Sequence, residues 1–228
     1  MCGRFTRMYT WHELVSLYHL SVPAMTNFQP RYNICPTDTI DVVVRGGDDR
    51  ALVPMRWGVV PEWWNKPLKE MRVATFNARS ESIAKKPMFR DSFRTRRCLI
   101  PASGYYEWLP TPSGKQPYYF TRRDGQVITF AGIHDGWMDP ERRERIWSCS
   151  IVITDANKVA ADIHDRMPVI LEPKDFQQWE RGGLKDAAVL MKPADEDVLQ
   201  KWLVSKRVNS SRADDADATL IDKIELPA

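Results

Sequence analysis

Short stretches in which apolar and polar residues alternate recur along most of the chain, and a period of two is typical of half-buried β-strands. Such strands are expected at residues 40–45, 51–57, 73–78, 103–108, 118–122, 127–133 and 148–154. The turn residues from Gly46 to Asp49 predict a hairpin that joins the first two of these strands. Asp124-Gly125 predicts a second hairpin, between the strands at 118–122 and 127–133.

Helical periodicity appears mainly outside these stretches. A first helix is expected to begin at Thr10, because Thr10 and Glu13 have the spacing of a capping box. Further helices are expected at residues 80–97 with a break at Pro87, 156–161, 173–181 and 194–204, and the proline-containing stretch 29–37 is expected to be irregular. Many short strands with helices at their edges favour an α+β fold, built around a curved antiparallel β-sheet or barrel with peripheral helices.

Composition restricts the kind of protein. A chain of 228 residues with 43% hydrophobic residues is expected to form one domain, residues 1–228, ending in a short tail at 210–228. No apolar run approaches the roughly 20 residues that span a bilayer, and no secretory signal is visible, so an intracellular protein is expected, in the cytoplasm or nucleoid of a bacterium or the nucleus of a eukaryote. A monomer is the simplest expectation. The four cysteines are far apart, without a CxxC pair, so we expect no disulfide framework, no metal site and no cofactor.

The net charge of +3 is small, but the basic residues are unevenly distributed. Between Lys66 and Arg97 there are ten basic and three acidic residues. A basic stripe of this kind suits binding to a phosphate backbone, although a solvated helix face gives the same pattern.

Tryptophan is also concentrated next to that stripe. Trp57, Trp63 and Trp64 fall within eight residues of a loop that contains glycine and proline. Neighbouring tryptophans beside a basic run suit stacking on unpaired bases, although aromatic packing that holds the loop in place is the alternative.

The start of the chain carries the candidate nucleophile. Removal of Met1 would leave Cys2 with a free α-amine next to its thiol, and this pair can condense with an aldehyde to an imine and then close a thiazolidine ring. Arg4 is expected to lower the pKa of the thiol through its nearby positive charge. The alternative is that Cys2 is an ordinary buried thiol.

Two further residues could move protons. Glu107 lies among aromatic residues in Gly104-Tyr105-Tyr106-Glu107-Trp108, and such surroundings should raise the pKa of a carboxyl group into the range of a general acid. A salt-bridged structural glutamate is the alternative. His164 lies among polar residues at the start of a strand, where it could act as acid, base or donor, although a lone loop histidine is more often structural.

Five stretches together resemble one family. They are Cys2-Gly3-Arg4-Phe5, Arg31-Tyr32-Asn33 with Pro36, Asn77-Ala78-Arg79 with Glu81, Gly104-Tyr105-Tyr106-Glu107-Trp108, and Ile163-His164-Asp165-Arg166-Met167-Pro168. In this order, from residue 2 to about residue 209, they resemble the SRAP family (SOS-response-associated peptidase), which processes abasic sites. The resemblance implies the SRAP fold, a role in the DNA damage response, and a covalent crosslink to abasic sites in single-stranded DNA or single-strand/double-strand junctions.

The resemblance also implies roles for particular residues. Cys2 would be the nucleophile that forms a thiazolidine with the C1′ aldehyde of the opened sugar. Asn77 would orient the N-terminus and the sugar, Glu107 would shuttle protons, and His164 would assist imine formation. The implied DNA contacts are Arg4 and Arg79 to phosphates, Trp63 and Trp64 to a base, and also Asn33 and Pro36.

Two further activities are expected from this chemistry. An imine without ring closure would permit β-elimination, so weak lyase activity should accompany the crosslink. The family name implies autopeptidase activity that removes Met1, although a methionine aminopeptidase would also accept the small side chain of Cys2. Replication-fork proteins are the further partners that this role suggests.

Two departures from the family pattern and two rival functions stay open at this point. Cys35 stands where a small apolar residue is expected, and the stretch from Trp64 to Asn77 is a few residues longer. The first rival is an N-terminal-nucleophile hydrolase or glutamine amidotransferase, in which the free amine acts as base for its own thiol. The second is a non-catalytic reader of modified or single-stranded DNA with an inert Cys2.

Overall fold

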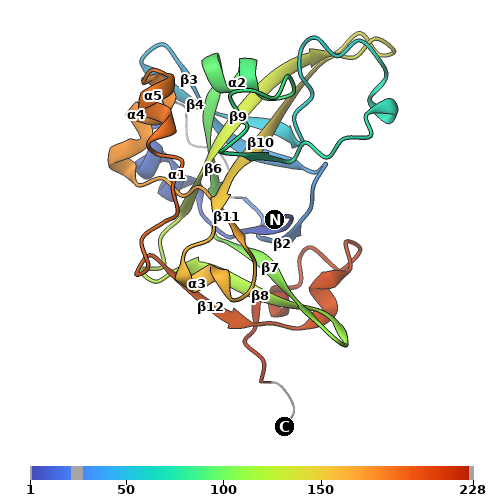
Figure 1. Ribbon diagram of the computed structural model, residues 1–228, viewed down its shortest axis with the longest axis vertical. Helices are drawn as coiled ribbons and strands as arrows, with labels where there is room; N and C mark the ends of the chain where they lie inside the picture. Colours follow the sequence, from blue (N-terminus) through green and yellow to red (C-terminus); the bar gives the residue numbers. More distant parts are fainter. Residues whose placement is uncertain (1, 22–27, 226–228) are drawn as a thin grey trace.

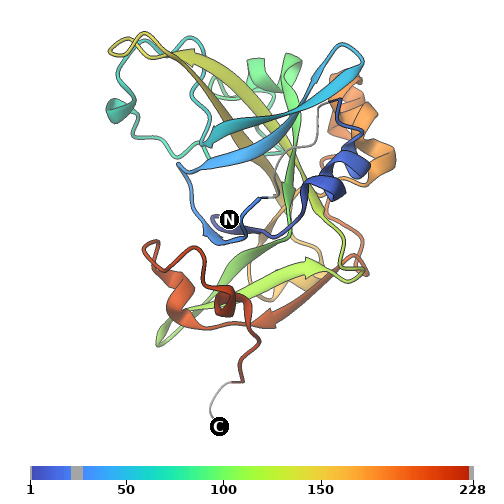
Figure 2. The same ribbon diagram turned by 180° about the vertical axis from the view of Figure 1, so that it is seen from behind.

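Two β-sheets lie one above the other in the computed structural model, which describes residues 2–21 and 28–225 (Figures 1 and 2). In the upper sheet, β9 pairs with both β6 and β10, so that the strands β10-β4-β3-β6-β9 close into a barrel. The barrel strands are β3 (Thr39–Gly46), β4 (Asp49–Trp57), β6 (Arg97–Ala102), β9 (Ile128–Met138) and β10 (Arg145–Asp155). Two short strands, β5 (Asn77–Arg79) and β11 (Arg166–Pro168), pair with the second half of β10.

The lower sheet is antiparallel and has the order β12-β8-β7-β1-β2. Its strands are β1 (Phe5–Arg7), β2 (Arg31–Ile34), β7 (Gly104–Thr111), β8 (Gly114–Arg122) and β12 (Leu199–Leu203). β6 of the barrel is followed almost directly by β7 of this sheet, so the two sheets are connected at their junction. The predicted fold class, an α+β protein with a curved antiparallel sheet or barrel and peripheral helices, is confirmed.

The helices are short and lie outside the barrel. They are α1 (Trp11–Tyr18), α2 (Arg90–Thr95), α3 (Lys158–Ala161), α4 (Phe176–Arg181) and α5 (Leu184–Ala188), with 3-10 turns at Leu68–Glu70, Pro173–Asp175, Lys206–Asn209 and Ala218–Ile221. α1, α4 and α5 gather on one side of the barrel (Figure 1). The predicted capping box of α1 is confirmed, since Glu13 N donates to Thr10 Oγ1 and Thr10 N donates to Glu13 Oε2. Across the described ranges, no helix has the length and apolar character needed to cross a membrane.

Alternation along the strands divides the apolar residues between two cores. Ile40 and Val42 of β3 point into a core that the barrel shares with the lower sheet, whereas Val43, the next residue, points to a core under the helices. The shared core also contains Phe5 and Tyr105 from the lower sheet. Residues at the junction of the two sheets therefore pack against apolar side chains of both sheets.

Part of the predicted strand pairing is wrong. The strands expected at 118–122 and 127–133 exist as β8 and β9, but they do not form a hairpin. β8 pairs with β7 and β12, and β9 pairs with β6 and β10. The hairpin partner of β8 is β7, across a tight turn in which Gly114 has φ 108°, a conformation that favours glycine.

Several predicted elements also differ in type or length. The helix predicted at 194–204 is wrong, because residues Leu199–Leu203 form β12 on the free edge of β8. Only Arg90–Thr95 of the helix predicted at 80–97 forms. Of the strand predicted at 73–78, only Asn77 and Ala78 form part of a strand, β5. Within the stretch 29–37, Arg31–Ile34 form β2. For β2 and β12, pairing with a distant strand outweighs local propensity.

Candidate active site

Cys2 lies just before β1 and is fully buried in the core that the two sheets share. Its backbone carbonyl accepts a hydrogen bond from Asn77 Nδ2 at 2.8 Å. Asn77 begins β5, which pairs in parallel with β10, so a strand attached to the barrel fixes the start of the chain. Asn77 Oδ1 is buried and has no hydrogen-bond partner within the described residues. Met1 lies outside those residues, and its expected removal stays a prediction.

The expectation that Arg4 lowers the pKa of the Cys2 thiol is wrong. Burial raises this pKa well above its ordinary value, and the negative charge of Glu107 raises it further. The Arg4 guanidinium is directed elsewhere in the molecule, as described below. Cys2 is therefore a neutral, protected thiol in this state, and its reaction would need a group that takes its proton.

Glu107 lies on β7 and is only 1% exposed. Burial raises the pKa of its carboxyl group to about 7, and the charge of Asp165 contributes in the same direction. A carboxyl group with this pKa can both give and accept a proton near neutral pH. The raised pKa expected from the aromatic surroundings is therefore present.

His164 precedes β11 and is partly exposed. Its Nδ1 accepts a hydrogen bond from the backbone N–H of Arg166 at 3.0 Å, which leaves the ring hydrogen on Nε2. Asp165 Oδ1 is 2.9 Å from the same nitrogen, but that side chain is 82% exposed, so the backbone contact decides the tautomer. Burial lowers the pKa of His164, and the imidazole is therefore neutral at neutral pH.

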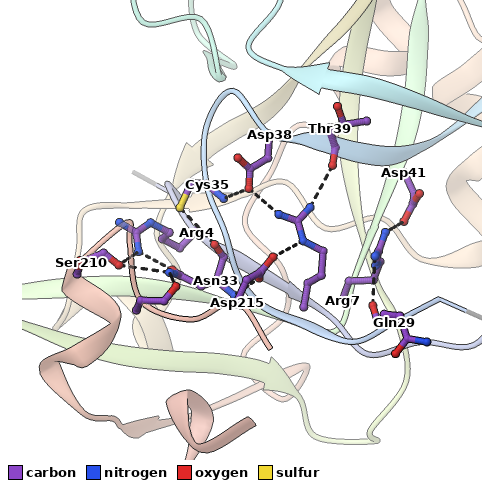
Figure 3. A network of polar contacts seen from close by, with 12 residues as sticks. Arg4, Arg7, Gln29, Asn33, Cys35, Asp38, Thr39, Asp41, Ser210 and Asp215 are labelled. Atoms are coloured by element: carbon purple, nitrogen blue, oxygen red, sulfur yellow. Dashed lines mark hydrogen bonds and ion pairs between the residues drawn. The ribbon is translucent and has the colours of Figure 1, made fainter. Parts of the chain in front are cut away.

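Arg4 and Asn33 are held together by the C-terminal part of the chain (Figure 3). Arg4 Nη1 donates to Asn33 Oδ1 at 2.6 Å, to the Val208 carbonyl at 2.6 Å and to the Ser210 carbonyl at 3.3 Å. Asn33 is 3% exposed, and its Nδ2 donates to the carbonyls of Ser210 and Ala213. Asn33 is therefore a buried hydrogen-bond partner that holds the Arg4 guanidinium in place. The expected contact of Asn33 with DNA stays a prediction.

An acidic residue of the C-terminal segment completes this network. Asp215 forms an ion pair with Arg31 and accepts a hydrogen bond from the backbone N–H of Asn33 at 3.0 Å. Arg31 also pairs with Asp38 at 2.8 Å, as Figure 3 shows. Residues beyond 209 were expected only as a tail, but through Asp215 they hold Arg31 and Asn33 of β2 in place.

An open cleft of about 630 Å³ begins beside Cys2. It is lined by Gly3, Arg4, Cys35, Pro36, Phe76, Trp108, Lys115, Asn209 and Ser211. Pro36 lines this cleft, and its expected contact with DNA stays a prediction. The half-buried Cys35 is a second thiol in the cleft, and its Sγ donates to the Asn33 carbonyl at 3.2 Å. A volume of about 630 Å³ lies within the range of ligand-binding clefts.

The two tryptophans lie apart from this cleft, on the loop 58–76 between β4 and β5. This loop projects from the barrel at the upper right of Figure 1. Trp63 is 50% exposed, whereas Trp64 is less exposed, its carbonyl accepts from Trp137 Nε1, and its own Nε1 is buried. The rings form an edge-to-face pair with centroids 6.3 Å apart. Trp63 is therefore the ring that the loop presents to solvent.

Arg79 is exposed at the end of β5, two residues after Asn77. Residues two apart on a strand point to the same side, so its guanidinium lies on the side that carries the Asn77 amide. It makes no side-chain hydrogen bond or ion pair with any other described residue. This cation is free to bind an anion.

Sequence reasoning missed three contributors to the cleft. Trp108 has its ring beneath the Arg4 guanidinium, with Cζ 5.9 Å from the ring centre, and its Nε1 donates to Asn209 Oδ1 at 2.7 Å. Lys115, on the β7–β8 hairpin, lines the cleft and lowers the pKa of His164. Trp108 could have been predicted to lie at the site, because it directly follows Glu107 in the sequence. Nothing local in the sequence connects Lys115 or Asn209 with the site.

The structure thus brings Cys2, Asn77 and Glu107 together. His164 lies near the same junction, because the charge of its neighbour Asp165 acts on Glu107. The family model described as SOS response associated peptidase (SRAP) matches residues 1–211, and the chain belongs to this family.

Two curated relatives and one solved structure are similar to most of this chain. The abasic site processing protein YoqW of Bacillus subtilis is 32% identical over 218 residues, which cover 93% of this chain and 96% of that protein. The abasic site processing protein HMCES of Xenopus tropicalis is 33% identical over 81% of this chain and 64% of its own length. A crystal structure of a Bacteroides thetaiotaomicron protein has the same fold, with a TM-score of 0.86, 23% identity, and coverage of 98% of this chain and all of that one.

Proposed function

We propose that this protein binds single-stranded DNA at an abasic site and forms a covalent crosslink to the lesion through Cys2, after Met1 has been removed. The observation that carries the proposal is the hydrogen bond from Asn77 Nδ2 to the Cys2 carbonyl, with Glu107 close enough to the thiol to raise its pKa. A fixed cysteine backbone directs the freed α-amine, and the carboxyl group supplies a proton donor beside it. Relatives named for abasic site processing support the substrate class.

The chemistry begins with the opening of the sugar. An abasic deoxyribose is mostly a closed hemiacetal, so an acid must protonate the ring oxygen before the C1′ aldehyde is released. Glu107, with a pKa of about 7, is protonated in part of the molecules at neutral pH and suits this step. The neutral His164 can accept the proton that the amine loses on attack.

Ring closure then follows within one bound molecule. The α-amine of Cys2 adds to the aldehyde, water leaves and an iminium forms; the thiol adds to the same carbon and its proton passes to the Glu107 carboxylate. No oxidant or reductant is needed. Because the thiol and the imine are on one residue, their effective concentration is high. Ring closure removes the imine that would otherwise allow β-elimination, so strand cleavage should be a minor reaction.

Removal of Met1 is the step that activates this site. While Met1 is present, the nitrogen of Cys2 is an amide and cannot form an imine. The family name supports self-cleavage as the route, and the small side chain of Cys2 also makes Met1 a substrate for a methionine aminopeptidase.

Binding to DNA would combine cations and one exposed ring. Arg79 makes no ion pair with the residues that the structure describes, and it suits a phosphate next to the lesion. Arg4 lines the cleft, where its Nη1 is bound to Asn33. Trp63 suits stacking on a base that lacks its complement, which favours single strands or junctions over duplex DNA.

The experiment uses Met1-free protein, single-stranded DNA with one abasic site, and a denaturing gel. We expect a heat-stable shifted band, which is lost in Cys2→Ala. A band of equal strength in Cys2→Ala would contradict the proposal. Glutaminase activity without a band would instead favour an amidotransferase, and binding without a band would favour a non-catalytic reader.

A further inference from the structure

Tyr105 lies two residues before Glu107 on β7, so both side chains lie on the same side of the strand. Its ring is fixed in the shared core. It stacks on Phe120, with centroids 4.9 Å apart and planes at 12°, and it meets the edge of Phe130 at 5.9 Å. Opposite Tyr105 on β1 is Phe5, three residues after Cys2. The phenol therefore cannot move away from the site without disrupting the core.

The hydroxyl group of Tyr105 differs from those of the other buried tyrosines. Tyr9, Tyr18, Tyr106 and Tyr119 each form a hydrogen bond through the hydroxyl group, at 3.1, 2.7, 2.8 and 2.8 Å. The Tyr105 hydroxyl is buried and has no partner in the part of the chain that the structure describes. Buried polar groups are satisfied in the great majority of cases, so an exception beside a reactive group calls for a function.

Its surroundings indicate what the hydroxyl group would bind. The charges of Cys2 and Glu107 both raise the pKa of Tyr105, after the larger effect of burial, so the hydroxyl group lies within electrostatic reach of both. The phenol stays neutral at neutral pH and is a hydrogen-bond donor. A donor that is buried beside a thiol suits the sulfur best when the sulfur carries negative charge.

We propose that the Tyr105 hydroxyl donates a hydrogen bond to the sulfur of Cys2 while the thiazolidine ring closes and while it opens again. In closure, the S–H bond breaks, the proton passes to Glu107 and the C–S bond forms. In opening, the C–S bond breaks, the nitrogen lone pair re-forms the C=N bond, and the sulfur leaves with its electron pair and then takes a proton from Glu107. This role rests on the proposed function, and it makes Tyr105 a donor to a reacting atom.

The Tyr105 hydroxyl would stabilise a thiolate that the other groups around Cys2 disfavour. The thiol is fully buried, the nearby carboxylate disfavours its ionisation, and the guanidinium of Arg4 is engaged with Asn33 and the C-terminal segment. A neutral donor stabilises the thiolate without adding a buried charge of its own.

The test is Tyr105→Phe, which keeps the stacked ring and removes only the hydroxyl group. It is made in Met1-free protein with Cys35→Ser, so that Cys2 is the thiol that reacts with iodoacetamide. We expect crosslinking and its reversal to slow by about tenfold, as one hydrogen bond to a charged group would give. The pH profile of Cys2 alkylation should move up by about one unit, while folding stability is kept.

Tyr106→Phe is the matched control, because it removes a hydroxyl group that donates to the Tyr32 carbonyl rather than facing Cys2. Its rates and alkylation profile should equal those of the parent. An unchanged profile or unchanged rates in Tyr105→Phe, or equal changes in both variants, would overturn the proposal. If the parent forms no crosslink, the proposed function fails, whereas the alkylation profile still decides whether Tyr105 bonds to the sulfur.

Discussion

Glu107 shows how one buried side chain connects stability with chemistry. Its carboxyl group has an ordinary pKa of 4.5 and reaches about 7 in the fold, mainly through burial. The folded protein therefore holds this proton more tightly than the unfolded chain does. The resulting stabilisation is complete below the ordinary pKa and is lost as the pH rises through about 7, where the folded state must bury a carboxylate.

Glu107→Gln should remove this pH dependence, because glutamine is neutral throughout. Relative to the parent, the variant should gain up to about 3 kcal/mol of unfolding free energy between pH 4.5 and about 7. Urea unfolding at several pH values measures the difference. A constant difference across this range would show that Glu107 titrates normally.

The same variant probes the proton transfer. Without an acid at this position, we expect Glu107→Gln to crosslink slowly and its adduct to reverse hardly at all, as measured by transfer of the protein to a second labelled oligonucleotide. Normal reversal would contradict the role of Glu107.

Among single residues, sequence reasoning selected Cys2, Asn77 and Glu107, which the structure brings together, but it did not predict the state of each. The chemistry of Cys2, Asn77 and Glu107 followed from residue types and the resemblance, and the raised pKa of Glu107 followed from its aromatic neighbours. The pKa of Cys2 was predicted in the wrong direction, because proximity along the chain suggested that Arg4 faces the thiol. Its guanidinium is bound to residues about 200 positions away, which no local pattern reveals.

At the scale of elements, strands were easier to predict than their partners. The hairpin of β3 and β4 was predictable because its turn residues lie between the two strands. The edges of β8 are instead taken by β7 and by β12, which begins 77 positions after the last residue of β8 in the chain. The residues of β12 carry an ambiguous apolar pattern, and only the open edge of β8 makes them a strand.

The loop 58–76 carries a prediction of its own. Trp63→Ala should weaken binding to single-stranded DNA by about 1–3 kcal/mol, the value of one base stack, with little change in folding stability. Fluorescence anisotropy with unmodified single-stranded DNA measures this without the covalent step.

Trp64→Ala is the control from the same loop. Its side chain is the more buried of the pair, so its loss should lower the melting temperature more than that of Trp63. If Trp64→Ala weakens binding and Trp63→Ala does not, the assignment of the stacking ring is reversed.

At the scale of the whole molecule, the site exists because two sheets meet. The barrel contributes Asn77 through β5 and His164 through the loop before β11, and the lower sheet contributes Glu107 through β7. The C-terminal segment fastens Arg4 and β2 from below. A class of fold was predictable from the strand pattern, but this convergence depends on pairings that span most of the chain.

The central claim is that the two reactive groups of one residue, Cys2, bind the abasic sugar. The most direct measurement is the mass of the DNA-bound peptide after digestion of the crosslink. The account predicts a peptide that begins at Cys2 and carries the opened sugar with loss of one water, and that resists borohydride because its imine has been closed by sulfur. An adduct on a peptide that retains Met1, or on a lysine, would contradict it.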